Sequence, residues 1–268
     1  MDVLLISGAP PYPLNDPARA LVHYLARDLG QYHYVIDLVS FFSEPEDFAQ
    51  IPRYERYFRK VEFIPRPELS PAMLQQRIEH PEIRFPAYAD VTWSPQMWSS
   101  ISELVTNRHY DVVQVVGGIE VYEYFHLIHT LPNLFVTALS SLQLRHELEG
   151  VTSNRRKQRQ LQQELDLMRD YESWMYSPYQ QVVISTQEEL HLLQKMAQTQ
   201  VTTMPPGVDM DYFVPTGHEP QIPALMFIGD FASHSVHSAA RRLCEVILPV
   251  VKRSIPEAVL FLVGANPP

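Results

Sequence analysis

The feature of this sequence that most constrains its fold is an alternation of buried strands and capped helices that starts at the first residues. Residues 3–7 (VLLIS) form the continuous apolar run of a strand covered on both faces, and the proline-rich stretch after them cannot continue it. A helix is then predicted with Asp16 as its N-cap, Pro17 at its first position and Gly30 as its left-handed stop. A second strand at residues 34–39 completes a right-handed βαβ unit.

The same alternation continues beyond residue 40, although residues 65–95, with many prolines, give no clear pattern. Further strands are predicted at residues 61–64, 111–116, 134–139, 181–185 and 201–204. Helices are predicted at residues 96–108, 121–129, 155–176 and 187–196. Because strands that alternate with helices form a parallel sheet covered on both faces, residues 1–213 predict a Rossmann-like α/β domain.

The composition of the chain changes after this first domain. Residues 214–223 are polar and rich in proline, as in an interdomain linker. A buried strand, a helix over residues 235–254 and a second buried strand follow and form one βαβ unit. Two parallel strands with one helix cannot cover both faces of a sheet, so residues 224–268 predict the start of a second Rossmann-like domain. We therefore expect a truncated or partial sequence.

Composition and charge exclude several classes of protein. Hydrophobic residues make up 46% of the 268 residues and charged residues 19%, which is enough to build a core and unlike a disordered tail. The formal charge of −10 argues against a general nucleic-acid binder, which needs a basic face. A single cysteine, Cys244, cannot form an internal disulfide or a structural zinc site, so a reducing, cytosolic setting is expected.

No secretory or membrane-crossing segment is predicted. The N-terminus carries only a short apolar run, with Asp2 where a secretory signal has positive charge. The most apolar stretch near the other end is interrupted by charged side chains such as Lys252 and Glu257. We therefore expect a soluble cytoplasmic protein, or one that is at most peripheral to the inner face of a membrane.

Candidate binding residues lie where strands end, because open α/β sheets bind ligands at the carboxyl ends of their strands. The loop with Gly8, Pro11 and Tyr12 is either a ligand-binding loop, in which Tyr12 stacks on a sugar or a base, or a connection that proline stiffens. Gly118 precedes a predicted helix start, which receives an anion or a hydroxyl group or is only a tight turn. Glu120 at that point is a candidate to bind hydroxyl groups or to act as a general base.

Several other chemistries are disfavoured. Glu123, His126 and His129 are spaced three apart on one helix face, but the second motif of a di-iron site is absent. A solvated or partly buried helix face is therefore favoured, and no metal site is predicted. The sequence also has no nucleophile elbow, P-loop, Cys–His pair or zinc signature, which weakens hydrolase and kinase interpretations.

Three segments together resemble one family. The stretch MRDYESWMYSPYQQVVISTQEELHLL has an acid-bearing amphipathic helix, a strand and a second helix. MPPGVDMDYFVP is similar to a P-N-G-V-D-x-x-x-F turn, which Gly207, Val208, Asp209 and Phe213 fit. The last segment has a strand ending in glycine, a helix ending in ILP, an IPEA turn and a strand ending in VG. These segments resemble the family 4 retaining glycosyltransferases, whose GT-B fold has two Rossmann-like domains facing each other across a cleft.

The resemblance implies transfer of a hexosyl group from a nucleotide-sugar to a polysaccharide or glycolipid acceptor, with retained configuration and without a metal or other cofactor. It implies an acceptor side on the first domain and a donor side on the second. With Glu120 as the catalytic residue, the acceptor-side residues are Gly8, Pro11, Tyr12, Gly118, Arg145 and Ser185. The donor-side residues are Gly229, Asp230, His234 and Gly264.

The sequence departs from the family pattern at both sides. Gly8 is not followed by the second glycine that lets the backbone approach the donor phosphates. Gly229 is followed by Asp230 rather than by the Arg and then Lys of many members, and His234 is the nearest cation. These departures leave a rival interpretation open, in which the chain is a non-catalytic GT-B-like module that acts as an assembly or binding partner.

Two basic features remain. Residues 154–160 (NRRKQRQ) contain four cations, which are Arg155, Arg156, Lys157 and Arg159. Peripheral glycosyltransferases use such a patch to meet anionic lipids, and the alternative is a solvated helix face. Arg145 meets a phosphate or pairs with Glu149 at the next helical turn.

Overall fold

A computed structural model describes residues 1–14, 17–68, 70–80, 86–138, 155–194, 199–215, 217 and 222–266 of the chain. The protein divides into two compact units, Met1–Gly207 and Val208–Pro268. The boundary between the units precedes the stretch predicted as a linker, residues 214–223. The predicted N-cap Asp16 and the candidate Arg145 lie outside the described residues.

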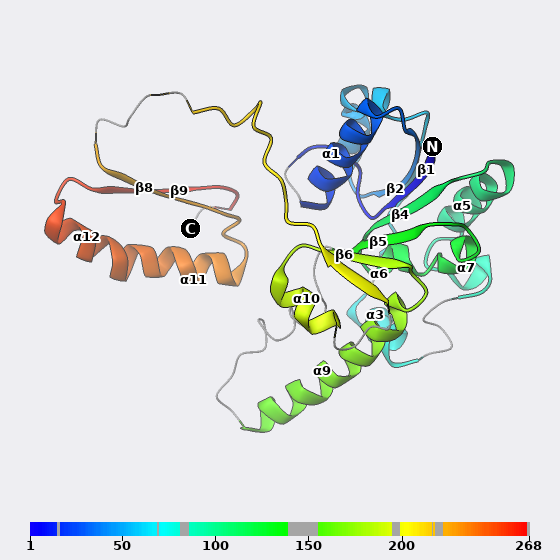
Figure 1. The fold of residues 1–268 in the computed structure, drawn as a ribbon. Helices are drawn as coiled ribbons and strands as arrows, with labels where there is room; N and C mark the ends of the chain where they lie inside the picture. The colour runs from blue at the N-terminus through cyan, green and yellow to red at the C-terminus, as the bar shows by residue number, and fades with distance from the viewer. Residues whose placement is uncertain are drawn as a thin grey trace. The chain divides into compact units, whose positions relative to one another are not determined.

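The first unit is built on a seven-stranded parallel sheet with the strand order β3-β2-β1-β4-β5-β6-β7 (Figure 1). The strands are β1 Asp2–Ser7, β2 Val35–Phe42, β3 Lys60–Pro65, β4 Val112–Gly117, β5 Leu134–Ala138, β6 Gln181–Ile184 and β7 Gln200–Thr203. In register, Leu5 of β1 lies between Leu38 of β2 and Gln114 of β4. The strand order reverses between β1 and β4, and such a reversal is where open α/β sheets bind ligands. The predicted Rossmann-like α/β fold is confirmed.

Helices and short helical turns connect these strands. They are α1 Pro17–Gln31, α2 Glu46–Ala49, η1 Ile51–Arg53, η2 Glu55–Tyr57, α3 Pro71–Glu79, η3 Ala89–Val91, α5 Pro95–Asn107, α6 Ile119–Tyr122, α7 Phe125–Ile128, α9 Arg155–Tyr176 and α10 Gln187–Gln194. Among the described residues, no helix is long and apolar enough to cross a membrane. The single helix predicted at residues 121–129 is wrong, because α6 and α7 are separate short helices. Tyr124 between them leaves helical geometry, with φ −80° and ψ 7°.

The end of α1 corrects the prediction for Gly30. This glycine lies inside the helix, and the left-handed residue is His33, with a φ of 62°. The Tyr34 amide donates to the Leu29 carbonyl and the His33 amide to the Gly30 carbonyl, which is the hydrogen-bond pattern of a Schellman cap. The stop therefore lies three residues later than predicted.

Strand β1 contributes to two hydrophobic clusters, one on each face of the sheet. Leu4 and Ile6 of β1 belong to a cluster with helices α5 and α9, whereas Val3 and Leu5 belong to a cluster with α1. All four side chains are at most 3% exposed. Because both faces are covered, successive residues of β1 from Val3 to Ile6 are all apolar, which explains this continuous run in the sequence.

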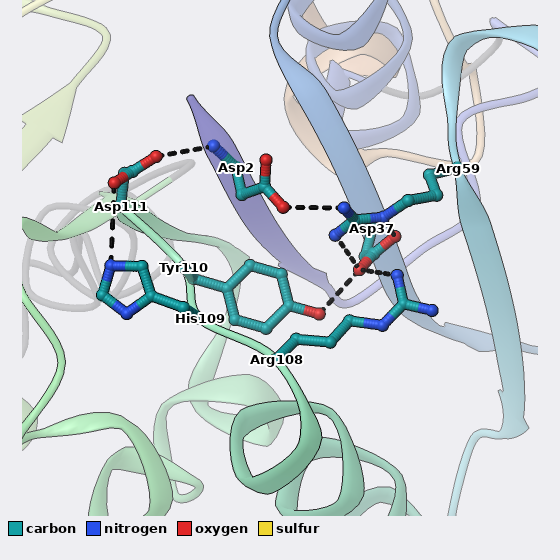
Figure 2. A network of polar contacts seen from close by, with 7 residues as sticks. All are labelled: Asp2, Asp37, Arg59, Arg108, His109, Tyr110 and Asp111. Atoms are coloured by element: carbon teal, nitrogen blue, oxygen red, sulfur yellow. Dashed lines mark hydrogen bonds and ion pairs between the residues drawn. The ribbon is translucent and has the colours of Figure 1, made fainter.

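A polar network fixes the amino ends of β1, β2 and β4 (Figure 2). The Asp37 carboxylate of β2 is fully buried and accepts hydrogen bonds from Arg59 Nε (2.9 Å) and Nη2 (2.7 Å), Tyr110 Oη (2.7 Å) and Arg108 Nη1 (3.1 Å). Arg59 also donates to the Asp2 carboxylate at 2.7 Å. The network therefore joins the first three strands in chain order to the segment that enters β4.

The second unit contains the two parallel strands β8 Ala224–Ile228 and β9 Val259–Val263. Between them α11 His234–Arg242, a π-helical turn at Leu243–Ile247 and α12 Leu248–Ser254 form one continuous helical stretch, close to the predicted 235–254. Pro249 lies in the first turn of α12. Proline cannot donate a helical hydrogen bond, and the π turn immediately before it accommodates the missing donor.

Candidate functional site

The site lies at the carboxyl edge of the sheet, where β1 and β4 end side by side. The Gly8 amide donates to the Val116 carbonyl at 2.9 Å and so joins the two strand ends. Glu120 lies in the first turn of α6, which begins directly after β4, and is 8% exposed. Its carboxylate Oε1 accepts a hydrogen bond from Arg66 Nη2 at 2.9 Å. Arg66 follows β3 and donates its backbone amide to Phe42.

Two glycines make room for the Glu120 carboxylate. A Cβ atom on Gly8 would lie 2.7 Å from Oε1, and a Cβ on Gly118 would lie 2.7 Å from Oε2. Side-chain carbon atoms do not approach an oxygen that closely. The Glu120 carboxylate therefore occupies its present place between two backbone segments because both positions are glycine.

Gly117, the last residue of β4, has a different requirement. Its φ is +147°, and a Cβ there would lie 2.9 Å from Val121 Cγ2 and 3.1 Å from the Gly8 amide nitrogen. Its carbonyl accepts a hydrogen bond from the buried Tyr122 hydroxyl. The turn that aims Glu120 at the carboxyl edge thus depends on a backbone conformation that only glycine adopts freely.

We expect Gly117→Ala to lower the free energy of unfolding by about 1–3 kcal/mol, because alanine at positive φ is strained and its Cβ meets backbone. Gly118→Ala is the matched control: its φ is −110°, and the new Cβ meets only the movable end of the Glu120 side chain. The control is expected to cost about 1 kcal/mol or less. Urea unfolding measures both, and equal costs would contradict this account of the turn.

The loop after β1 is held by internal hydrogen bonds. The Ser7 hydroxyl accepts from the Ala9 amide at 3.2 Å and donates to the Ala9 carbonyl at 2.7 Å. Tyr12 is half-buried, with the Arg53 guanidinium 5.0 Å from its ring centre and Arg19 donating to its carbonyl at 2.7 Å. Pro11 in the same loop is buried. The Tyr12 ring therefore already makes a cation–π contact with Arg53.

The structure brings together three of the predicted site residues, Gly8, Gly118 and Glu120. Ser185 follows β6 at the same edge of the sheet, but two strands away from β4. Arg66 was missed by the sequence analysis. Arg66 lies two residues after the strand predicted at residues 61–64, which is a position where ligand-binding residues are expected. The proline-rich stretch at residues 65–95 gave no clear pattern, so Arg66 was not singled out. The binding roles of these residues stay predictions.

Behind the site, Glu123 is buried and paired. It is 2% exposed, its Oε1 accepts from the Trp93 amide at 2.8 Å, and its Oε2 lies 3.5 Å from Arg77 Nη2. His126 and His129, by contrast, are exposed, so the three residues do not share one solvated face. Among the described residues, no group of three His, Cys, Asp or Glu side chains could hold a metal ion.

Burial raises the pKa of Glu123 to about 7, against the opposing effects of the Trp93 amide and the Arg77 charge. An acid whose folded-state pKa is raised stabilises the fold below its unfolded-state pKa of about 4.3, and this contribution is lost as the pH rises to about 7. The linked loss is on the order of 3 kcal/mol.

Glu123→Gln is therefore expected to remove most of this pH dependence, because glutamine keeps the shape and cannot ionise. The measurement is the free energy of unfolding between pH 4 and pH 8 for both proteins. Two parallel curves would show that Glu123 does not titrate in this range.

In the second unit, the candidate donor-side residues lie where β8 and β9 end. A Cβ on Gly264, whose φ is +145°, would lie 1.8 Å from the Gly229 carbonyl oxygen, so the two strand ends touch through backbone. Asp230 Oδ1 accepts from the Ala232 amide at 3.0 Å and from Asn266 Nδ2 at 2.9 Å. His234 is exposed and begins α11. The structure thus gathers the predicted donor-side residues at one edge of this unit.

The predicted basic patch begins α9. Its four exposed cations are Arg155, Arg156, Lys157 and Arg159. The buried residues of α9 all lie in its last two turns, from Tyr171 to Tyr176. The amino-terminal half of the helix is therefore the solvent-facing part (Figure 1).

The sequence matches no known family model, and no curated protein matches it. Solved structures are similar in fold. UGT71G1 of Medicago truncatula, complexed with UDP-glucose, has a TM-score of 0.54 and 10% identity and matches over 99% of this chain and 66% of its own. WaaG, a glycosyltransferase involved in lipopolysaccharide biosynthesis, has a TM-score of 0.51 and 13% identity, over 98% of this chain and 63% of its own.

Phytolacca americana UGT2, complexed with UDP-2fluoro-glucose and pterostilbene, has a TM-score of 0.50 and 12% identity, over 99% of this chain and 71% of its own. The chain thus spans between 63% and 71% of the lengths of these three structures. At identities this low the likeness concerns the fold alone, and membership of family 4 stays a prediction. The fold of this chain is that of the Rossmann-like units of GT-B glycosyltransferases.

Proposed function

We propose that this chain belongs to a glycosyltransferase that moves a hexosyl group from a nucleotide-sugar to a polysaccharide or glycolipid acceptor with retained configuration. The observation that carries the proposal is the buried carboxylate of Glu120, held between two glycines and Arg66 at the point where the strand order reverses. A ligand-binding edge with one fixed proton acceptor suits the activation of a hydroxyl group. The fold likeness to sugar-transferring enzymes supports it.

In this proposal Glu120 binds the acceptor hydroxyl through Oε2 and takes up its proton. Arg66 engages Oε1 and so fixes the carboxylate, and Gly8 and Gly118 keep the space around it narrow. The role of these residues is to position the hydroxyl oxygen against the anomeric carbon. Pro11, Tyr12 and Ser185 extend the acceptor side along the same edge.

The donor side in this proposal consists of Gly229, Asp230, His234 and Gly264. A leaving nucleoside diphosphate is anionic, and the start of α11 offers partial positive charge beside the imidazole of His234, which can donate a hydrogen bond. No metal or other cofactor is required, and the nucleotide-sugar is a co-substrate. Added chelator is expected to leave transfer unchanged.

The proposed function is tested by calorimetric titration with UDP, GDP and their glucose and mannose conjugates, followed by a transfer assay. We expect one nucleotide-sugar to bind and its sugar to be transferred, with the anomeric configuration of the product, read by NMR, unchanged. His234→Ala should weaken donor binding, whereas the matched control His237→Ala, also exposed on α11, should not. Failure of every donor to bind would favour the non-catalytic module instead.

A second part of the proposal concerns the membrane. The four cations at the start of α9 would meet anionic lipid headgroups at the inner face of the membrane, where each is worth about 1 kcal/mol. Sedimentation with vesicles of phosphatidylglycerol, compared with phosphatidylcholine, measures this contact. Replacing all four by glutamine should abolish it, while Lys252→Gln with Arg253→Gln on α12 serves as the control. Equal binding by both variants would contradict the assignment.

A further inference from the structure

The space between the ends of β1 and β4 already contains an anion that belongs to the protein. The two Glu120 oxygens lie against Gly8 and Gly118, each 2.7 Å from where a Cβ would be. The side chain of Glu120 is 11% exposed, so its carboxylate is largely buried at this edge of the sheet. A ligand that binds between the ends of β1 and β4 therefore contacts the Glu120 carboxylate.

The loop after β1 offers few backbone donors to a ligand. The Gly8 amide is bound to Val116, and the Ala9 amide is bound to the Ser7 hydroxyl. Three of the next four residues are prolines, which have no amide hydrogen. Within residues 8–13, all of which are described, only Tyr12 is left to supply an amide. Loops that bind phosphate do so with several successive amides, which this loop cannot provide.

The charges of Arg66 and Glu120 at this edge also neutralise each other before any ligand binds. Arg66 is a cation that a phosphate would need, but its Nη2 is 2.9 Å from Glu120 Oε1. A phosphate at this edge would bring two negative charges within a few ångströms of the carboxylate, which is strongly unfavourable where water is partly excluded. Hydroxyl groups, in contrast, can donate to the carboxylate without any charge cost.

We propose that the acceptor bound at the β1–β4 edge is a neutral, hydroxyl-bearing sugar, and that Glu120 excludes phosphorylated acceptor sugars from this edge. This inference rests on the proposed function only in taking this edge as the acceptor side. The specificity follows from the negative charge of Glu120, from a loop in which only the Tyr12 amide is left for a ligand, and from an arginine that already pairs with Glu120.

The test measures binding without any nucleotide-sugar. The probes are glucose, galactose, mannose and N-acetylglucosamine, each beside its own 6-phosphate, and the readout is the amide NMR signals of Gly8 and Gly118 in the full chain. We expect at least one neutral sugar to shift these signals and its 6-phosphate to bind at least about tenfold more weakly.

Glu120→Gln should bring the two dissociation constants of that pair within about threefold of each other, because it removes the repulsion and releases Arg66. Glu62→Gln is the matched control, since Glu62 lies on β3 and pairs with Lys60 away from the edge, and it should keep the full preference. The inference is overturned if a 6-phosphate shifts the same signals as strongly as its neutral sugar, or if none of the neutral sugars shifts them.

These results separate the inference from the proposed function. A chain that prefers neutral sugars but transfers no hexosyl group would keep the inference and lose the function. A chain that transfers a sugar to a 6-phosphate acceptor would keep the function and lose the inference.

Discussion

Replacing Asp37 by asparagine is expected to lower the free energy of unfolding by about 3–5 kcal/mol, the usual effect of breaking a buried ion pair from one side. The Asp37 carboxylate is 0% exposed and accepts four hydrogen bonds, from Arg59, Arg108 and Tyr110. An asparagine would turn its amide group toward donors and leave the two arginines without their shared counter-charge. Urea unfolding with an unchanged m-value measures the effect.

The matched control is Asp2→Asn in the same network. Asp2 also pairs with Arg59, but its side chain is 35% exposed, so its ion pair is expected to contribute about 0–1 kcal/mol. If the two variants lose the same stability, the network does not depend on the buried carboxylate.

Asp37 should also determine how the free energy of unfolding decreases at acidic pH. Burial alone would raise the pKa of Asp37, but the hydrogen bonds from Arg59 and Tyr110 and the charges of Arg59 and Arg108 outweigh it and hold the pKa below its usual value. The stabilisation by Asp37 is therefore fully present above the unfolded-state pKa, about 3.9, and is lost as the pH falls through the lower folded-state pKa. This sign is opposite to that of Glu123, which acts at higher pH.

Under the proposed function, replacing Glu120 by glutamine is expected to lower the rate of sugar transfer by about 10²–10⁴-fold, the range that a general base contributes. Glutamine keeps the length of the side chain and its fit between Gly8 and Gly118, but it cannot take up a proton. The loss should appear in kcat and should persist across the pH range in which the protein is folded.

Glu62→Gln is again the control, because it removes the same charge from the first unit without touching the edge. Its rate should equal that of the unchanged protein. A Glu120→Gln protein that retains its full rate would show that the carboxylate accepts no proton during transfer.

Local patterns in the sequence were sufficient to predict the sheet, because a parallel strand covered on both faces is apolar at most of its positions. Residues 3–7 carry that signal, and β1 is found at Asp2–Ser7. α3 carried a weaker signal, since its buried residues are only Arg77 and Ile78. The start of α3 has ordinary capping residues, with the Ser70 side chain accepting from the Met73 amide and Pro71 at the first position. Because many other prolines surround Ser70 and Pro71, the sequence analysis did not recognise them as a helix start.

The candidate site was predictable only where it depends on strand ends. Gly8, Gly118 and Glu120 follow apolar runs, and the carboxyl ends of parallel strands share one edge. The pairing of Arg66 with Glu120 spans 54 residues, and no periodicity records it. The contact between Tyr110 and Asp37 spans 73 residues and was missed for the same reason. Partners of this kind follow from the folded geometry and not from local pattern.

The position of the Glu120 carboxylate between Gly8 and Gly118 has a consequence for how these residues vary among homologues. An alanine at Gly8 or Gly118 would have to displace the Glu120 carboxylate from its present place, so the three positions are coupled although they are far apart along the chain. A relative that has lost the acid can carry alanine at either glycine without this displacement, whereas one that keeps the acid cannot. Descent should therefore preserve or discard the three residues together, and their joint presence would mark the homologues that share this edge.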